Sequence, residues 1–151
     1  MYITLETDYA VRIVSVLCID GGKIDAKTIS ERSGVMLRFA LKILRKLVSA
    51  DIIKSYKGAQ GGYEINRDPS EITLRMVIEA IEGTYYFSRC LSDEKGCSRG
   101  ADGACCYQRA FGEITKMVRE KLDSYNFADM INHSEEFRER CNEQEGAVSA
   151  E

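Results

Sequence analysis

The sequence predicts a mainly α-helical fold with a small β wing, in which a winged helix-turn-helix domain is followed by a long C-terminal dimerisation helix. Three observations favour this fold. Apolar residues recur with helical spacing along most of the chain, and two short β-prone segments flank a glycine-rich turn. The 151 residues include one proline and no tryptophan, a composition that suits helices better than a sandwich or a barrel.

The first two helices are expected near the N-terminus. Over residues 7–20 apolar side chains recur every three or four positions, and a Gly-Gly pair then ends the pattern. Cys18 lies among the aliphatic residues of this helix and is interpreted as a small core residue. The segment AKTISERSG predicts a second, shorter helix that Asp25 can cap and Gly34 can end.

A third helix and a wing complete the expected motif. The third helix, Met36–Ala50, has an apolar stripe on one side, and its opposite face carries Arg38, Lys42, Arg45 and Ser49. Two helices joined by a short turn form a helix-turn-helix. In the following segment, DIIKSYKGAQGGYEINRD, β-prone residues on both sides of the glycine-rich loop predict a two-stranded wing.

The remaining chain divides into four parts. A fourth helix in ITLRMVIEAIEG completes the first domain, residues 1–83. Residues 84–105 lack periodicity and contain several cysteines and glycines, which predicts a functional loop. Residues 106–131 predict a long helix, and the apolar seam along Tyr107–Tyr125 resembles a helix that packs on its own copy. The charged residues 132–151 are expected to form a disordered tail.

Charge is distributed unevenly along the chain, whose net charge is −3. Residues 1–70 carry 11 Lys and Arg against 8 Asp and Glu, whereas residues 71–151 carry 10 against 16. Between residues 36 and 57 there are six basic residues and one acidic residue, Asp51. A basic helix followed at once by a wing is typical of a surface that binds double-stranded DNA. The candidate DNA contacts are Arg38, Lys42, Arg45, Lys46, Ser49, Lys54, Tyr56 and Lys57.

Cysteines are the second chemical signal, at positions 18, 90, 97, 105, 106 and 141. Neither a signal peptide nor an apolar run of bilayer length is readable, so a cytoplasmic location is expected, where clustered cysteines indicate metal or redox chemistry. Cys90, Cys97 and either Cys105 or Cys106 are spaced Cys-x6-Cys-x7-Cys. Thiolates are soft ligands of iron–sulfur clusters and of zinc, but structural zinc sites usually have closer cysteine pairs. By spacing alone, a cluster and a set of free thiols remain equally good interpretations.

The segment ISERSGVMLRFALKILRKLVSADIIKSYKGAQGGYEI, followed by ITLRMVIEAIEG and the loop cysteines, resembles the Rrf-type winged-helix transcriptional regulators. The likeness runs from about residue 1 to residue 131. The GGY after the wing turn, the EG that ends the fourth helix and the cysteine loop are specific in that order. The family includes an iron–sulfur cluster regulator, a nitric-oxide-sensing repressor, a rhizobial iron regulator and a cysteine metabolism repressor.

The resemblance implies a homodimer with crossing C-terminal helices, operator DNA as the partner, and a two-iron or four-iron cluster whose state changes operator affinity. By position, Cys90, Cys97 and Cys105 or Cys106 match the cluster cysteines. Asp8 matches an aspartate that completes the cluster from the other subunit in the nitric-oxide-sensing branch. Judged from the residues alone, Asp8 is equally well explained as an acid that the helix dipole favours in a first turn.

Two positions depart from the family pattern. The cluster-regulator branch has a histidine shortly after the third cysteine, where this chain has Gln108, and the one histidine, His133, lies toward the tail. Leu41 stands where that branch has an acidic residue on the recognition helix, so base preference is not carried over. Lys57 occupies a position where relatives often have an arginine that probes the minor groove.

The main hypothesis is a dimeric DNA-binding regulator whose operator affinity is controlled by an iron–sulfur cluster that senses redox state, nitric oxide or iron–sulfur status. One alternative is a cluster-free regulator of the same fold, controlled by a partner protein or by thiol oxidation. Another is a zinc-stabilised interaction module. The chain has no CxxC, no phosphate-binding loop and no histidine near a cysteine, so enzymatic activity is not expected. Because no apolar run of bilayer length is present, no membrane partner is expected either.

Overall fold

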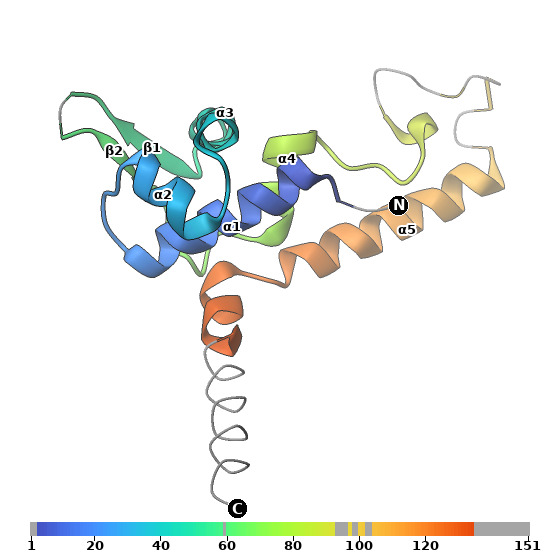
Figure 1. The fold of residues 1–151 in the computed structure, drawn as a ribbon. Helices are drawn as coiled ribbons and strands as arrows, with labels where there is room; N and C mark the ends of the chain where they lie inside the picture. Colours follow the sequence, from blue (N-terminus) through green and yellow to red (C-terminus); the bar gives the residue numbers. More distant parts are fainter. Residues whose placement is uncertain (1–2, 59, 93–96, 98–99, 102–103, 135–151) are drawn as a thin grey trace, which may run out of the picture.

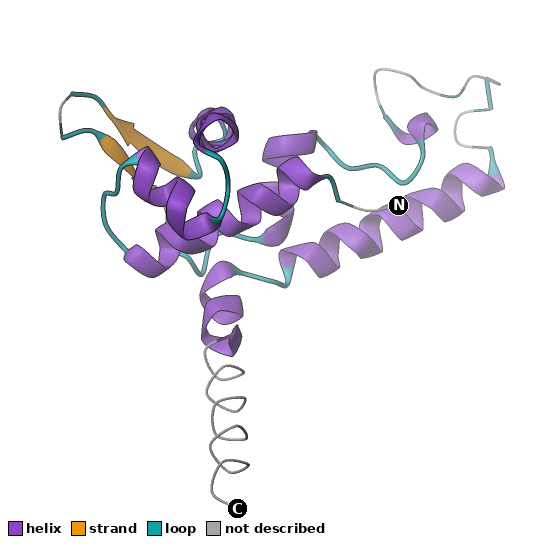
Figure 2. Ribbon diagram, viewed as in Figure 1, coloured by secondary structure: helices purple, strands orange, loops and turns teal. Residues whose placement is uncertain are grey.

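The computed structural model describes residues 3–58, 60–92, 97, 100–101 and 104–134 (Figures 1 and 2). Helices and one antiparallel pair of strands make up the fold, as the sequence predicts. A further helical stretch covers residues 127–134. In chain order the named elements are α1 (Leu5–Asp20), α2 (Ala26–Ser33), α3 (Leu37–Ser49), β1 (Ile53–Tyr56), β2 (Gly62–Ile65), α4 (Leu74–Glu82), the 3₁₀ turn η1 (Arg89–Leu91) and α5 (Cys106–Asp123).

Three helices of the first domain, α1, α2 and α4, begin at capping side chains, whereas α3 begins after Met36 without one. Thr4 accepts a hydrogen bond from the backbone N–H of Thr7, so α1 starts two residues before its predicted position. Asp25 caps α2 by accepting from two backbone N–H groups, as expected. Gly34 follows α2 with a φ of 67°, a left-handed conformation that favours glycine.

The wing forms where the β-prone segments predict it, with Ile53 opposite Ile65 and Tyr56 opposite Gly62. Two glycines are required by close approach of the backbone. A Cβ atom at Gly61 would lie 2.4 Å from the Tyr56 carbonyl oxygen, and one at Gly62 would lie 2.7 Å from the carbonyl oxygen of Ile24. These contacts fix the path of the wing against the segment that precedes α2.

The core of the first domain lies between α1, α3 and α4, and it also includes a residue from beyond α5. Phe127 is fully buried in the same cluster as Leu17, Leu44 and Leu47. Its backbone N–H donates to the carbonyl oxygen of Ile72 at 3.0 Å. The chain therefore returns to the first domain after α5, and residues around 127 belong to that domain as well as residues 1–83.

Figure 1 shows α5 running along one side of the domain and projecting beyond it. Thr115 is the only buried residue of this 18-residue helix. Tyr107 and Met117 are each 66% exposed, which leaves apolar surface in solvent. The helix ends at Asp123, and the helical stretch after it extends to residue 134, three residues into the segment expected to be a tail; residues 135–151 lie outside the described part.

Candidate nucleic-acid interface and cysteine segment

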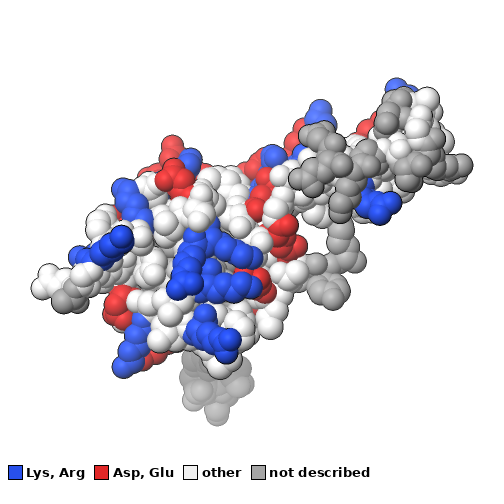
Figure 3. Space-filling model, turned by 90° about the horizontal axis from the view of Figure 1, so that it is seen from above, with Lys and Arg blue, Asp and Glu red and all other residues white. Residues whose placement is uncertain are grey.

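The outer face of α3 forms an open groove. The inner face of the helix is buried through Ala40, Ile43, Leu44 and Leu47. Seen from above in Figure 3, Lys and Arg side chains gather over α3, and others lie toward the wing. The groove has a volume of about 950 Å³, and none of the six residues that line it is acidic. They are Leu37, Arg38, Phe39, Leu41, Lys42 and Arg45.

The basic residues of α3 differ in how far they are engaged within the chain. Lys46 Nζ lies 2.8 Å from Glu6 Oε1 and donates to the Ile81 carbonyl oxygen at 3.1 Å, so this ammonium joins α3 to α1 and α4. Lys42 Nζ lies 3.2 Å from the other oxygen of Glu6. The hydrogen bond from Lys46 is the largest cause that lowers the pKa of Glu6 below its ordinary 4.5.

Two guanidinium groups remain available at the groove. Within the described part of the chain, Arg38 and Arg45 form no ion pair, and both are exposed. Ser49 donates its hydroxyl to the Arg45 carbonyl oxygen at 3.0 Å, one helical turn back. Of the predicted α3 contacts, Arg38 and Arg45 therefore present the most accessible donors, and Lys42 is shared with Glu6.

The wing adds further positive charge beside α3. Lys54, Tyr56 and Lys57 are all exposed. The Tyr56 hydroxyl donates to the Glu64 carboxylate across the two strands, which raises the pKa of Tyr56. The Lys23 ammonium lies 5.5 Å from the centroid of the Tyr56 ring. Lys54 and Lys57 thus extend the cationic surface, whereas the Tyr56 side chain is oriented by its neighbours.

The cysteine segment is built from η1 and the start of α5. Cys90 lies in η1, Cys105 is the residue before α5, and Cys106 is its first residue. The Gln108 side chain donates to the Cys90 carbonyl oxygen at 3.2 Å, and the Ser88 hydroxyl lies 3.3 Å from the Cys90 sulfur. Gln108, at the position where the sequence lacks a histidine ligand, therefore fastens η1 to α5.

Burial distinguishes the two adjacent cysteines. Cys105, the residue before α5, is half-buried, whereas Cys106, the first residue of the helix, is exposed. Both line one cavity together with Gln108. Gly112, one turn on, would have its Cβ 3.8 Å from Leu91 of η1, so the packed face continues along the helix.

The predicted metal donors are only partly brought together. Among the described residues, no three His, Cys, Asp or Glu side chains lie close enough to hold a metal ion. Cys97 stands between segments outside the described part. Asp8 lies in the first turn of α1, where its carboxylate is 2.7 Å from Arg12, the arrangement expected of a first-turn acid. The donor set is nevertheless rich in sulfur, which suits an iron–sulfur cluster.

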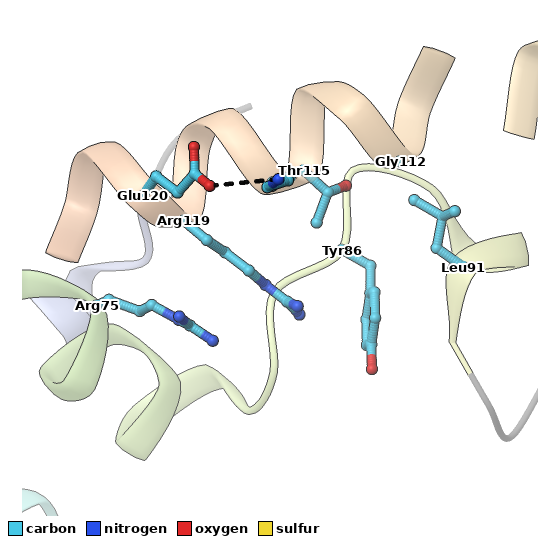
Figure 4. A pocket seen from close by; sticks show the side chains of 8 residues that line it. Arg75, Tyr86, Leu91, Gly112, Thr115, Arg119 and Glu120 are labelled. Atoms are coloured by element: carbon cyan, nitrogen blue, oxygen red, sulfur yellow. Dashed lines mark ion pairs between the residues drawn. The ribbon is translucent and has the colours of Figure 1, made fainter. Parts of the chain in front are cut away.

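The segment between α4 and η1 is attached to α5 by contacts that the sequence analysis missed. Arg119 donates to the Tyr85 carbonyl oxygen, and its guanidinium lies 4.8 Å from the centroid of the Tyr86 ring. Figure 4 shows Arg119 and Tyr86 side by side beneath α5, in a cavity of about 410 Å³. The Phe87 N–H donates to the Thr115 hydroxyl at 3.0 Å. These contacts join η1, and with it Cys90, to the middle of α5.

Ion pairs complete the link between α4 and α5. Arg75 lies 2.8 Å from Asp123 and 3.3 Å from Glu79, and the same Glu79 oxygen is 3.7 Å from Arg119 Nε. The partners on α4 and α5 are 48 and 40 residues apart in the sequence, so no local pattern reveals them.

Cys18 of α1 packs against the core as predicted, and burial raises the pKa of its thiol to about 12.

No described helix combines the length and the apolar character that crossing a bilayer requires.

The sequence model of a family described as "Rrf2: Iron-dependent Transcriptional regulator" matches residues 3–133. A putative HTH-type transcriptional regulator of Haemophilus influenzae is 26% identical over 134 residues, which are 87% of each chain.

Two solved structures share the fold. The structure of T. potens IscR superposes with a TM-score of 0.68 at 26% identity and covers 90% of each chain. The structure of CymR, the global cysteine regulator of B. subtilis, superposes with a TM-score of 0.67 at 24% identity and covers 88% of this chain and 98% of that one. The second likeness is one of fold alone.

Proposed function

The chain belongs to the Rrf2 family of transcriptional regulators, which are not enzymes, and from this premise we propose that it binds operator DNA in the cytoplasm as a homodimer whose affinity is controlled by a cysteine-held iron–sulfur cluster. The observation that carries DNA binding is the groove on α3, which has three basic residues and no acidic one in its lining. Lys54 and Lys57 of the adjacent wing give the same surface a second set of cations.

Selection of duplexes from a random 30-base-pair library, followed by affinity measurement at several salt concentrations, tests DNA binding. The affinity should fall steeply as the salt concentration rises. Each phosphate that the protein neutralises contributes about −0.9 to the slope of log affinity against log salt concentration. Arg45→Ala should weaken binding, whereas Arg109→Ala on α5, whose side chain is 85% exposed, should not. A duplex affinity that changes neither with salt concentration nor in Arg45→Ala would contradict this part of the proposal.

Dimerisation through α5 is supported by the surface that this helix leaves open. Tyr107 and Met117 are exposed, and Ile114 and Val118 are half-buried, on a helix that buries a single residue within its own chain. A second copy of α5 would cover these side chains. Met117→Glu and Val118→Glu together should convert a dimer to a monomer in analytical ultracentrifugation. Operator affinity should fall when the dimer dissociates, since a monomer contacts only one half-site.

The cluster is assigned to Cys90, Cys97 and Cys105, with Asp8 as the proposed fourth ligand. Such a cluster, when bound, supplies a group that gains or loses electrons and reacts with oxidants or nitric oxide. The chain's contribution is to hold η1 against α5 through Gln108 and Leu91. The half-buried position of Cys105 at the start of α5 supports it over the exposed Cys106 as the third ligand.

Cys105→Ala and Cys106→Ala form a matched pair that tests the assignment. Both variants, purified without oxygen, are analysed for iron and inorganic sulfide alongside the wild type. Cys105→Ala should lose both, and Cys106→Ala should retain them. The assignment of Cys105 fails if the two results are exchanged, and the cluster itself fails if the wild type contains no sulfide.

A second candidate function is a cluster-free regulator that responds to a partner protein or to thiol oxidation. It is favoured by the absence of a three-donor group among the described residues and by the exposed thiol of Cys106. Its signature is iron-free protein whose operator affinity changes with peroxide or with an added partner. Zinc in the same metal analysis would instead support the zinc-stabilised module.

A further inference from the structure

Apolar side chains share the α3 groove with the basic ones, and packing within the chain does not explain them. Leu37 is 42% exposed and Leu41 is half-buried, although both lie on the DNA-facing side of the helix. The core of the domain is already filled on this helix by Ala40, Ile43, Leu44 and Leu47, which are at most 1% exposed. Leu37 and Leu41 are therefore available for a contact outside the chain.

These two leucines form a continuous apolar strip beside the cations. They are four residues apart, so their side chains lie one above the other on the helix surface. Arg38 follows Leu37, and Lys42 follows Leu41, so each leucine stands next to a basic residue in the same groove. An occupant of this groove must offer apolar groups and negative charge at close spacing.

We propose that Leu37 and Leu41 contact the C5 methyl groups of thymines in the major groove and so make the operator preference depend on thymine. This inference rests on the proposed function. The thymine methyl group is the apolar feature that base pairs display in the major groove, and aliphatic side chains recognise it by contact. Phosphates on either side supply the negative charge that Arg38 and Arg45 require.

Double-stranded DNA fits this groove better than a protein partner does. The lining contains three cations and no acid, and the wing places Lys54 and Lys57 on the same cationic surface. A mainly apolar protein surface would bury the Arg38 and Arg45 guanidinium groups without a counter-charge, which is costly. The two flanking strands of a major groove instead provide a counter-charge for each of them.

The test uses duplexes obtained by selection with the wild-type protein, in which single thymines are replaced by deoxyuridine. This change removes one methyl group and leaves base pairing intact. Replacing a contacted thymine should weaken binding roughly fourfold, because one buried methyl group is lost. Affinity measured at every thymine in turn, at constant salt, should show such a loss at one or more positions in each half-site.

A double-mutant cycle assigns the effect to the two leucines. Leu37→Ala is the primary variant, since its side chain is already 42% exposed and its loss leaves the core unchanged. Leu41→Ala and the double variant follow, with thermal unfolding as a check on folding. Each variant should bind the thymine duplex more weakly and lose its sensitivity to uracil at the contacted positions. Ile19→Ala, a change at a 54% exposed residue of α1, should keep full sensitivity.

The outcomes separate this inference from the function on which it rests. If selection yields no preferred duplex, the proposed DNA-binding function fails and the inference fails with it. If a preferred duplex is found but every uracil substitution leaves the affinity unchanged, DNA binding stands and thymine recognition is wrong. If Leu37→Ala keeps the full uracil effect, or the leucine variants bind the thymine duplex as tightly as the wild type, the assignment to these leucines is overturned.

Discussion

The DNA-binding domain and the cysteine-bearing region are built in contrasting ways. In the domain, α1 buries six of its 16 residues, whereas α5 in the other region buries one of 18. Three helices of the domain, α1, α2 and α4, begin at a capping side chain, whereas α3, η1 and α5 do not. The domain thus buries far more of its helices within the chain than the cysteine-bearing region does.

The contrast indicates where regulation can act. A fully packed domain resists small changes, because its interior has no space to rearrange. The exposed apolar residues of α5 and the sulfur donors at its start are the features to which a second copy and a cluster are here proposed to bind. Loss of either partner should change the cysteine-bearing region and leave each α3 groove intact, so that the spacing of two grooves becomes the regulated quantity.

The largest expected effect concerns the boundary between the two regions. Phe127→Ala should destabilise the DNA-binding domain by about 3–5 kcal/mol, because it removes a fully buried aromatic side chain from the core. Denaturant unfolding measures the change. Phe87→Ala is the matched control, since Phe87 is 41% exposed and its truncation should cost far less. If Phe127→Ala lowered the free energy of unfolding as little as Phe87→Ala does, residues around 127 would not be part of the domain.

A smaller effect is expected where the segment between α4 and η1 contacts α5. Arg119→Met should cost about 1–2 kcal/mol, since it removes the hydrogen bond to Tyr85 and the contact with the Tyr86 ring. Hydrogen exchange should become faster in residues 84–91 and in α5, with α1 to α3 unchanged. Arg109→Met is the control, because among the described residues that side chain pairs only with exposed Glu113. Faster exchange throughout the domain would remove the distinction between the regions.

Glu6→Gln tests the DNA-binding domain by removing the carboxylate that pairs with the lysines of α3. Glu6 neutralises Lys42 and Lys46, so its removal should raise operator affinity roughly two- to fivefold and steepen the salt dependence by up to about one phosphate contact. Fluorescence anisotropy at several salt concentrations measures both. Glu31→Gln makes the same charge change at an exposed pair with Lys27. If both variants raise the affinity equally, net charge and not the release of Lys42 is responsible.

The smallest effect concerns pH. The hydrogen bond from the Thr7 hydroxyl is the largest cause that lowers the pKa of Glu82 below its ordinary 4.5, and Thr4 adds two more. A carboxyl with a lowered pKa contributes stability that is fully present above pH 4.5 and is lost as pH falls through the lower folded-state value. Glu82→Gln should therefore show a shallower loss of stability on acidification below pH 4.5. Parallel pH profiles for variant and wild type would exclude this contribution.

Local rules account for what the sequence predicted well. A single sequence reveals features that depend on neighbouring residues. These are the start of α2 at Asp25, its end at Gly34 and the pairing of the two wing strands. Phe127, Arg119 and Glu6 act across 30 or more residues, and no periodicity indicates their partners. The proposed preference for Cys105 over Cys106 depends on the burial of the two side chains, which spacing alone does not contain.

Operator affinity measured without oxygen, for the wild type and for the Cys90→Ala, Cys97→Ala, Cys105→Ala triple variant, tests the central claim most directly. Both proteins are assayed at the same salt on the same selected duplex, with inorganic sulfide determined in each sample. The account predicts sulfide in the wild type, none in the variant, and affinities that differ by roughly tenfold or more. Wild-type protein that lacks sulfide and binds the duplex as the variant does would contradict it.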